Sequence, residues 1–220
     1  KFEYQEPDEY RLDRLLSEFC GSLPISASCV SSEHFLTNRY EASEFFKGKK
    51  TWVMENFYRH MRKKFDILLD TQGLPTGGTW NFDADNRKPF RNEVPVPDIP
   101  RFHNDASEIY SYIQAQAIPY IGIPTDKIDF PVTRAQAVAC LKDFVVHRLP
   151  YFGTYEDAMH TQHPILFHSM LSFALNVKLI TPLEVVHAAI EAFHNQDNSI
   201  TLAQIEGFVR QIIGWREYMR

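Results

Sequence analysis

A long stretch without periodicity divides the chain and limits the folds open to it. Between Thr71 and Pro124 the apolar residues follow neither a helical nor a strand repeat. Glycines and prolines interrupt the run, among them Gly73, Pro75, Gly77, Gly78, Pro89, Pro95, Pro97 and Pro100. Such punctuation is typical of loops, and a structureless run of this length is rare inside one compact domain. We therefore expect a linker here, with one short helix at Ser107 to Ala117.

The residues before this stretch predict helices and one short strand. Pro7 and the acidic residues after it predict a helix start, and apolar residues follow at helical spacing. Ile25 to Val30 is the one convincing strand. Two further helices are expected, capped by Thr37 and opened by Thr51. A lone strand cannot hydrogen-bond itself, so its partners must lie elsewhere in the chain or outside it.

The residues after this stretch, Phe130 to Arg220, predict helix almost throughout. Three threonines have the N-cap pattern, each with Gln or Glu three residues later: Thr133 with Gln136, Thr181 with Glu184, and Thr201 with Gln204. The chain is thus expected to be mainly α. The last predicted helix is still running at Arg220, which favours a piece of a longer protein.

Charge and cysteine content exclude some classes of protein. The 220 residues hold 23 Lys and Arg against 28 Asp and Glu, a net charge of −5, so nucleic acid could bind only at a local basic face. One basic cluster exists, and a solvated helix face is its favoured interpretation: Arg59, His60, Arg62, Lys63 and Lys64. The three cysteines form no CxxC pair, which argues against a disulfide framework or a zinc ribbon.

The chain has no sequence signal for a membrane or for secretion. No apolar run reaches the roughly 18 residues that span a bilayer, and the first residues lack a signal-peptide pattern. We expect a soluble cytoplasmic protein with no membrane contact.

Metal-like patterns in the sequence are weak. His160, His163 and His168 lie near one another but match no strong zinc spacing. Glu184 and His187 form a Glu-x-x-His unit, yet di-iron bundles need two such units and further carboxylates. We expect no metal site in this chain.

A serine pair is the first candidate ligand site. Ser169 and Ser172 lie three residues apart, near the expected start of a helix just after Pro164. Hydroxyls and free backbone N–H groups at a helix start can bind a phosphate or pyrophosphate. The Ser-x-x-Ser spacing is also common in proteins without such a site.

Three residues on the last predicted helix are the second candidate. Gln211, Trp215 and Arg216 offer an aromatic plane beside an amide and a cation. This combination suits a flat conjugated ligand or an unstacked base. Packing of Trp215 in the core is an equally good interpretation of the same residues.

Six segments carry a resemblance that covers essentially all 220 residues: EPDEYRLD (6–13), FYRHMRKKFDILL (57–69), GGTWNFDADNRK (77–88), TRAQAVACLKDFVVHRLPYFGTYEDAM (133–159), FHSMLSFALNVKLITPLEV (167–185) and IEGFVRQIIGWREYMR (205–220). Read in order, they resemble the photolyase/cryptochrome superfamily. They are most similar to its bacterial branch of deoxyribodipyrimidine photolyase-related proteins, the iron–sulfur bacterial cryptochromes and photolyases.

The resemblance implies a fragment of a larger, two-domain protein. Residues 1–70 would be the C-terminal part of an α/β antenna domain, 71–125 the interdomain linker, and 126–220 the first helices of an all-helical FAD-binding domain. The family also carries a lumazine antenna and a [4Fe-4S] cluster, whose ligands are not in this chain. We expect the fragment to be inactive alone.

The resemblance also implies a function, with two alternatives. The parent protein would be a light-driven carbon–carbon lyase that repairs pyrimidine lesions, mainly (6-4) photoproducts, in UV-damaged DNA by electron transfer from FAD. A blue-light photoreceptor of the cryptochrome type would keep the flavin without repair. A helical interaction module would have lost the cofactor. No protein partner can be inferred.

Site residues follow from the matched positions. Ser169, Leu171 and Ser172 match the segment that holds the flavin phosphates, and Tyr151 or Phe152 falls near a flavin-contacting tyrosine. The cofactor-binding candidates are Tyr151, Phe152, His168, Ser169, Met170, Leu171, Ser172 and Gln211. The catalytic candidates, which match the pocket of flavin and lesion, are Trp215 and Arg216.

Overall fold

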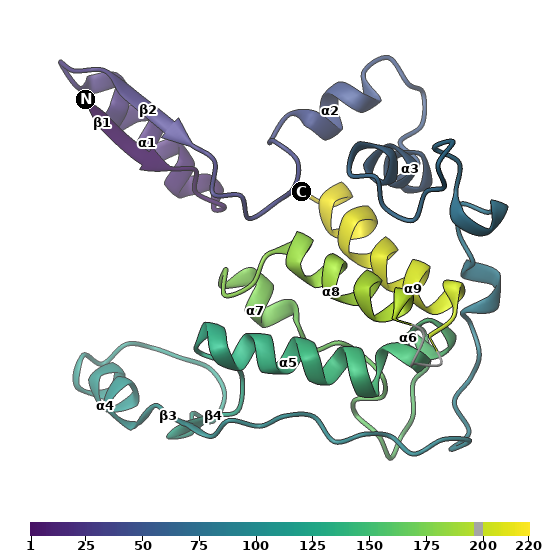
Figure 1. Ribbon diagram of the computed structural model, residues 1–220. Helices are drawn as coiled ribbons and strands as arrows, with labels where there is room; N and C mark the ends of the chain where they lie inside the picture. The colour runs from purple at the N-terminus through teal and green to yellow at the C-terminus, as the bar shows by residue number, and fades with distance from the viewer. Residues whose placement is uncertain (196–199) are drawn as a thin grey trace.

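Helices dominate the computed structural model, which describes residues 1–195 and 200–220 (Figure 1). The mainly α prediction is confirmed. The helices are α1 (Tyr10–Ser22), α2 (Glu41–Phe46), α3 (Met54–Lys64), α4 (Ser107–Ala115), α5 (Arg134–His147), α6 (Leu149–Tyr155), α7 (Ser172–Asn176), α8 (Pro182–His194) and α9 (Leu202–Val209). The strands are β1 (Phe2–Gln5), β2 (Ala27–Val30), β3 (Asn104–Asp105) and β4 (Lys127–Ile128). Two short 3-10 turns, η1 (Thr76–Gly78) and η2 (Asp83–Asp85), and a π-helical segment, η3 (Arg210–Arg216), complete the list.

The first thirty residues form a small β1–α1–β2 unit. The predicted strand is confirmed as β2, and its partner lies elsewhere in the chain: β1 pairs with it in parallel, with Phe2 opposite Ala27. The sequence analysis missed β1 because a strand of four residues carries too little pattern. Pro7 does not open the helix; Glu9 is the N-cap, and its carboxylate accepts from the backbone N–H groups of Arg11 and Leu12.

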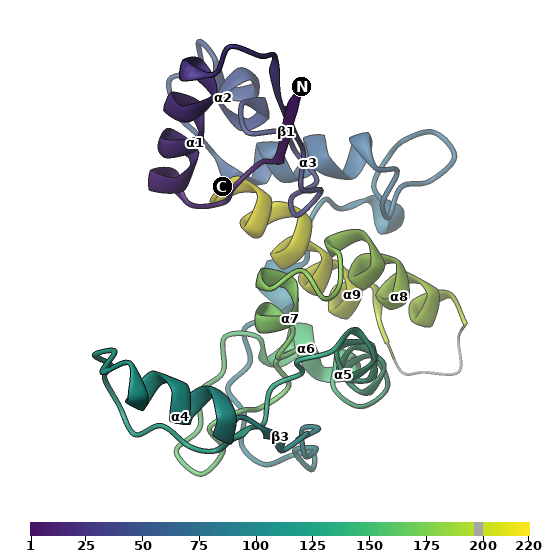
Figure 2. The same cartoon turned by 90° about the vertical axis from the view of Figure 1, so that its left-hand side faces the viewer.

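The other helices, except α4, share one hydrophobic core. On α3, Phe57, Tyr58 and Met61 are fully buried, and they join the same cluster as Phe144 of α5 and Phe208 of α9. Helix α3 packs against η3 and lies beside the C-terminal helix in both views (Figures 1 and 2). Among the described residues, this core takes none of its buried members from residues 1–30. Packing thus joins α2 and α3 to the helical body, while the predicted domain boundary near residue 70 stays a prediction.

The early part of the predicted linker packs tightly against α6 and α9. Asn86 is 1% exposed, and its Nδ2 donates to the carbonyl of Ala203 at 3.0 Å. A Cβ on Gly207 would lie 2.7 Å from that Nδ2, and one on Gly153 would lie 2.9 Å from it. These two glycines therefore leave the space that the Asn86 side chain fills.

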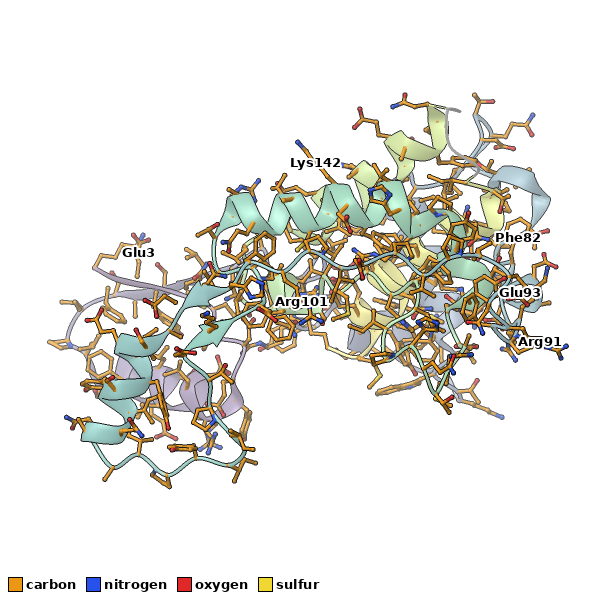
Figure 3. All side chains as sticks on the ribbon, turned by 90° about the horizontal axis from the view of Figure 1, so that it is seen from below. Glu3, Phe82, Arg91, Glu93, Arg101 and Lys142 are labelled. Carbon is orange, nitrogen blue, oxygen red and sulfur yellow. The ribbon has the colours of Figure 1, made fainter. Side chains whose placement is uncertain are left out.

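The rest of the linker is irregular, as its glycines and prolines predict, apart from α4 and β3, which pairs with β4 just after the linker. Figure 3 shows Phe82 and Arg101 near opposite ends of a run that follows the helical body. The predicted short helix is confirmed as α4, which buries none of its own residues and projects away from the body in Figure 2. Its first residue, Ser107, is the predicted one.

All three predicted threonine N-caps are confirmed, and one of them forms a complete capping box. Thr181 forms a complete capping box with Glu184 at the start of α8. The hydroxyl of Thr133 accepts from the N–H of Gln136, and the hydroxyl of Thr201 accepts from the N–H of Gln204. In neither case does the glutamine side chain accept from the N–H of the threonine, and Gln136 accepts from the N–H of Val132 instead.

Two other predicted helix starts are wrong. Helix α2 begins at Glu41 instead of at Thr37, because the Thr37 hydroxyl and N–H both donate to the buried carboxylate of Glu217. Helix α3 begins at Met54, three residues beyond Thr51. Across the ranges that the structure describes, none of the helices has the length and apolar character needed to cross a bilayer.

Candidate functional site

The last helix changes its geometry where the candidate residues lie. Helix α9 continues into η3, whose hydrogen bonds close wider, π-type turns. Such π segments occur frequently at functional sites because they displace side chains from the regular helical positions. Ile213 is buried, and Gly214 faces α3, where a Cβ on Gly214 would lie 3.2 Å from the ring of Tyr58. Trp215 is turned outward and is 41% exposed.

The serine pair lies on a loop and at the start of a short helix. The prediction of a helix beginning just after Pro164 is wrong, because α7 starts at Ser172, with Leu171 as its N-cap residue. Ser169 is therefore a loop residue, and its hydroxyl accepts from the N–H of Leu171 at 3.4 Å. With only five residues, α7 has a small helix dipole. Any anion binding here depends on hydroxyls and single N–H groups.

These two segments meet around one hollow of about 370 Å³, which we call the serine–tryptophan cavity. Its polar wall comes from Ser169, Ser172, Asn176, Gln211, Trp215 and Arg216. Its apolar surface comes from Leu175, Ile212 and Met219. The structure thus brings together the two candidate clusters that the sequence presents separately.

Arg216 is fixed at one corner of this cavity. Its Nη1 lies 3.2 Å from Oε1 of the buried Glu217, and its Nη2 donates to His34 at 3.1 Å. The guanidinium also stacks 4.2 Å from the ring centroid of Phe35. Burial lowers the pKa of Arg216 and also lowers the pKa of His34. A neutral imidazole can accept this hydrogen bond, so the cation is held in place without a second positive charge beside it.

A buried carboxylate orients Gln211. The side chain of Glu156 is 6% exposed. Its Oε2 accepts from Nε2 of Gln211 at 3.3 Å, and its Oε1 accepts from Nη2 of Arg210 at 3.0 Å. Burial raises the pKa of Glu156. Gln211 and Trp215 also border a second, polar cavity of about 390 Å³, whose lining includes Asp83. We call this one the acidic cavity.

A second buried carboxylate supports the same helix. Glu206 is completely buried and accepts from the Tyr58 hydroxyl at 2.9 Å and the Phe82 N–H at 3.0 Å. Burial raises the pKa of Glu206 as well. Sequence reasoning missed both glutamates, because their partners come from three separate segments, α3, the linker and η3, and no local motif connects them.

Comparison with known proteins identifies the family. A family model described as deoxyribodipyrimidine photo-lyase-related protein matches residues 1–128. The chain belongs to this family. It is also 38% identical over 217 residues to a (6-4) photolyase of Agrobacterium fabrum (strain C58 / ATCC 33970). The matched region covers 98% of this chain and 42% of that protein. The photolyase-related chain thus spans less than half the length of this curated relative.

Two further relatives of this photolyase-related chain are uncharacterized proteins of Acanthamoeba polyphaga mimivirus. One is 46% identical over 66 residues, 30% of this chain and 50% of the viral protein. The other is 29% identical over 93 residues, 40% of this chain and 47% of the viral protein. Neither name adds information on function. The resemblance seen in the sequence is confirmed at the level of the family.

Two other cofactor-binding candidates of the photolyase-related chain lie in its core. Phe152 is 6% exposed, with its ring centroid 5.9 Å from that of Phe144 and 5.3 Å from that of Phe208. Leu171 is completely buried. Neither side chain borders the serine–tryptophan cavity, so in the described residues both act as packing groups.

The last three candidates also lie apart from this cavity. Tyr151 packs on Phe167, with ring centroids 5.1 Å apart. His168 places Nε2 3.2 Å from the backbone oxygen of Glu156. Met170, with a positive φ of 58°, borders a different hollow. In residues 1–195 and 200–220, no three His, Cys, Asp or Glu side chains are grouped as metal ligands.

The basic cluster of α3 differs from the predicted solvated face. Arg62 is 1% exposed and donates to three backbone carbonyls, those of Ile67, Leu68 and Trp80. Arg59 pairs with Glu55, and Lys64 pairs with Glu41. The cluster therefore presents much less free positive charge than its sequence indicates.

Proposed function

We propose that this chain supplies one wall of the flavin and lesion site of a light-driven DNA photolyase that repairs UV-induced pyrimidine lesions, with the (6-4) photoproduct as the favoured lesion. The observation that carries the proposal is the meeting of Ser169 and Ser172 with Trp215 and Arg216 around one cavity. Membership of the photolyase-related family and the 38% identity to a protein named (6-4) photolyase support it.

The residues around the serine–tryptophan cavity fit part of a FAD molecule. Two hydroxyls and the Arg216 cation suit the pyrophosphate, since charge-assisted donors bind phosphate oxygens strongly. The side chains of Leu175 and Ile212 offer an apolar surface to a flat ring. The volume of about 370 Å³ is at the lower end for ligand pockets, so the remaining surface of a dinucleotide would come from residues beyond these walls.

Each residue has a distinct task in this proposal. Ser169 and Ser172 would donate to phosphate oxygens, while Arg216, held by Glu217 and His34, would balance their charge. The exposed indole of Trp215 would stack on a base flipped out of the duplex. Bound flavin, once reduced and excited by light, would supply the electron that splits the lesion. We assign no residue of this chain to the lumazine or to the iron–sulfur cluster.

The test is flavin retention in the full-length protein. Ser169→Ala combined with Ser172→Ala should lower the ratio of bound flavin to protein, measured by absorbance after gel filtration. Ser111→Ala, an exposed serine on α4, is the matched control and should leave the ratio unchanged. An unchanged ratio in the double variant would overturn the phosphate assignment.

A repair assay separates photolyase from photoreceptor. The full-length protein should restore (6-4)-damaged DNA under blue light and not in the dark. Bound flavin without light-dependent repair would favour a photoreceptor. Absence of flavin would favour a helical interaction module.

A further inference from the structure

His34 lies on the segment that joins β2 to α2, against the residue at one corner of the serine–tryptophan cavity. Its ring nitrogens Nε2 and Nδ1 lie 3.1 Å and 3.5 Å from Nη2 of Arg216, which is 182 positions further along the chain. Although His34 is outside the lining of this cavity, it therefore contacts a residue that is part of the wall.

Hydrogen bonds to Glu217 fix the segment that carries this histidine. The N–H groups of Leu36 and Thr37 donate to Oε2 of Glu217 at 3.0 Å and 3.1 Å, and the Thr37 hydroxyl donates to the same oxygen at 2.9 Å. The other carboxylate oxygen, Oε1, accepts from Nη1 of Arg216 at 3.2 Å. Figure 1 shows this segment passing beside the C-terminal end of the chain. One buried carboxylate thus sets the position of both the histidine segment and the guanidinium.

The charged groups that face His34 are mostly cations. Besides Arg216, they are Arg220 near the C-terminal end, Lys178 just after α7, and the carboxylate of Asp8, which precedes α1 and pairs with Lys178 at 2.9 Å. His34 is 8% exposed, and burial, followed by the charge of Arg216, lowers its pKa. At neutral pH the ring is therefore uncharged, and one of its nitrogens offers a lone pair to Arg216.

Protonation of His34 would break this arrangement. Both ring nitrogens lie within 3.5 Å of Nη2, so an added proton would turn the acceptor into a donor and bring a second positive charge against the guanidinium. Like charges at this distance repel strongly where water is partly excluded. Arg216 would then leave the position in which Glu217 and the neutral imidazole hold it.

We propose that His34 is a positioning residue: its neutral ring holds Arg216 at the wall of the serine–tryptophan cavity, and its protonated ring releases Arg216, so that acid loosens a bound flavin. This inference rests on the proposed flavin site, in which Arg216 balances the charge of the phosphates. It adds control of that site by pH, through a residue outside the lining of the cavity.

The first test is the rate of flavin release from the full-length protein between about pH 8 and about pH 5, the range in which imidazoles titrate. The fluorescence of the freed flavin measures the rate. Release should be about threefold or more faster at the acidic end, because the repelled guanidinium no longer pairs with the phosphates.

Three variants show whether His34 causes this acceleration. His34→Gln keeps an amide oxygen as acceptor but takes up no proton in this range, so it should release flavin at the parent rate at about pH 8 and lose the acceleration. His34→Leu removes the acceptor and should release flavin faster throughout the range. His187→Gln, at an exposed histidine on α8, is the matched control and should keep the parent profile.

A second test does not need bound flavin. Because the pKa of His34 in the folded state is below its ordinary value of 6.5, the unfolded chain takes up this proton first as the pH falls, and the fold loses stability below pH 6.5. Urea titrations of the full-length protein, freed of flavin, measure this loss. It should be smaller in His34→Gln than in the parent protein or in His187→Gln.

The outcomes separate this inference from the proposed function. A parent-like pH profile of flavin release in His34→Gln, or a parent-like release rate in His34→Leu, would overturn the positioning role. A full-length protein that never holds flavin would refute the proposed cofactor site, and the urea titrations would then decide on His34. Equal losses of stability on acidification in His34→Gln and in the parent would overturn the dependence of the contact on a neutral ring.

Discussion

Trp215 borders both the serine–tryptophan cavity and the acidic cavity, with 41% of its surface exposed. An indole in that position can stack on an extruded base, and such stacking contributes about 1–3 kcal/mol. Trp215→Ala in the full-length protein should therefore weaken binding to (6-4)-damaged DNA about tenfold, and binding to undamaged DNA much less. Titrations with labelled duplexes measure both affinities. Trp52→Ala, which removes another exposed indole, is the control. Equal losses on both duplexes would leave Trp215 a packing residue.

Arg62 has a structural role that its neighbours on α3 do not share. Its buried guanidinium donates to Ile67 at 3.1 Å and to Trp80 at 2.8 Å, and also to Leu68. Arg62→Leu leaves these carbonyls without their donor, at about 1–3 kcal/mol for each buried group. The free energy of unfolding, from urea titration, should fall by about 3 kcal/mol or more. Arg59→Leu, on the exposed face, should cost less than about 1 kcal/mol. Similar losses in the two variants would refute the role of Arg62.

The stability of the N-terminus of helix α8 should depend on pH through Glu184. Hydrogen bonds from Arg134, together with those from the N–H and hydroxyl of Thr181, lower the pKa of Glu184 from 4.5 to about 2. A lowered pKa in the folded state contributes stability above pH 4.5. This contribution is lost as the pH falls from 4.5 towards 2, because the unfolded chain takes up its proton first.

Glu184→Gln should therefore flatten the dependence of the unfolding free energy on pH between 4.5 and 2. Urea titrations at several pH values in that window measure it. Glu108→Gln, on exposed α4, is the control and should keep the slope of the parent protein. A parent-like slope in Glu184→Gln would contradict the assignment.

Local signals explain which elements the sequence predicted. Thr181 and Glu184 cap α8 with atoms from their own turn, so four residues are enough to predict its start. Thr37 looks equally suitable as a cap, but its hydroxyl is used by Glu217, 180 residues away. Pro164 likewise precedes a loop, because the chain becomes helical only at Ser172.

The residues of the candidate site also differ in whether local sequence could reveal them. The serine pair and Trp215 were found from residue type and spacing within single segments. Glu156 and Glu206 were not, because each side chain acquires its role from partners in other elements, such as Gln211 and Tyr58. Phe152 and Leu171 were candidates from their matched positions alone, which cannot reveal that both are packed in the core.

In the whole molecule, the helical body and the β1–α1–β2 unit are stabilised by different interactions. The helical body has a continuous hydrophobic core, whereas α1 of the β1–α1–β2 unit buries none of its residues; Leu15, for example, is 62% exposed. Ion pairs connect the small unit to the body: Arg39 with Glu6 and Asp13, Lys178 with Asp8, and Arg220 with Glu6. These side chains are between 14% and 37% exposed, so solvent still reaches the pairs. Ion pairs open to solvent contribute about 0–1 kcal/mol each, and salt screens them.

The β1–α1–β2 unit should therefore open more readily than the body. In hydrogen exchange followed by mass spectrometry, peptides from β1 and β2 should exchange faster than those from α5 and α9, because they lack buried apolar contacts. Raising the salt to roughly 1 M should speed exchange in the small unit and leave the body nearly unchanged, since the Debye length falls to about 3 Å. Parallel acceleration in both units would mean that they open together, and the ion pairs would then not be what holds the small unit in place.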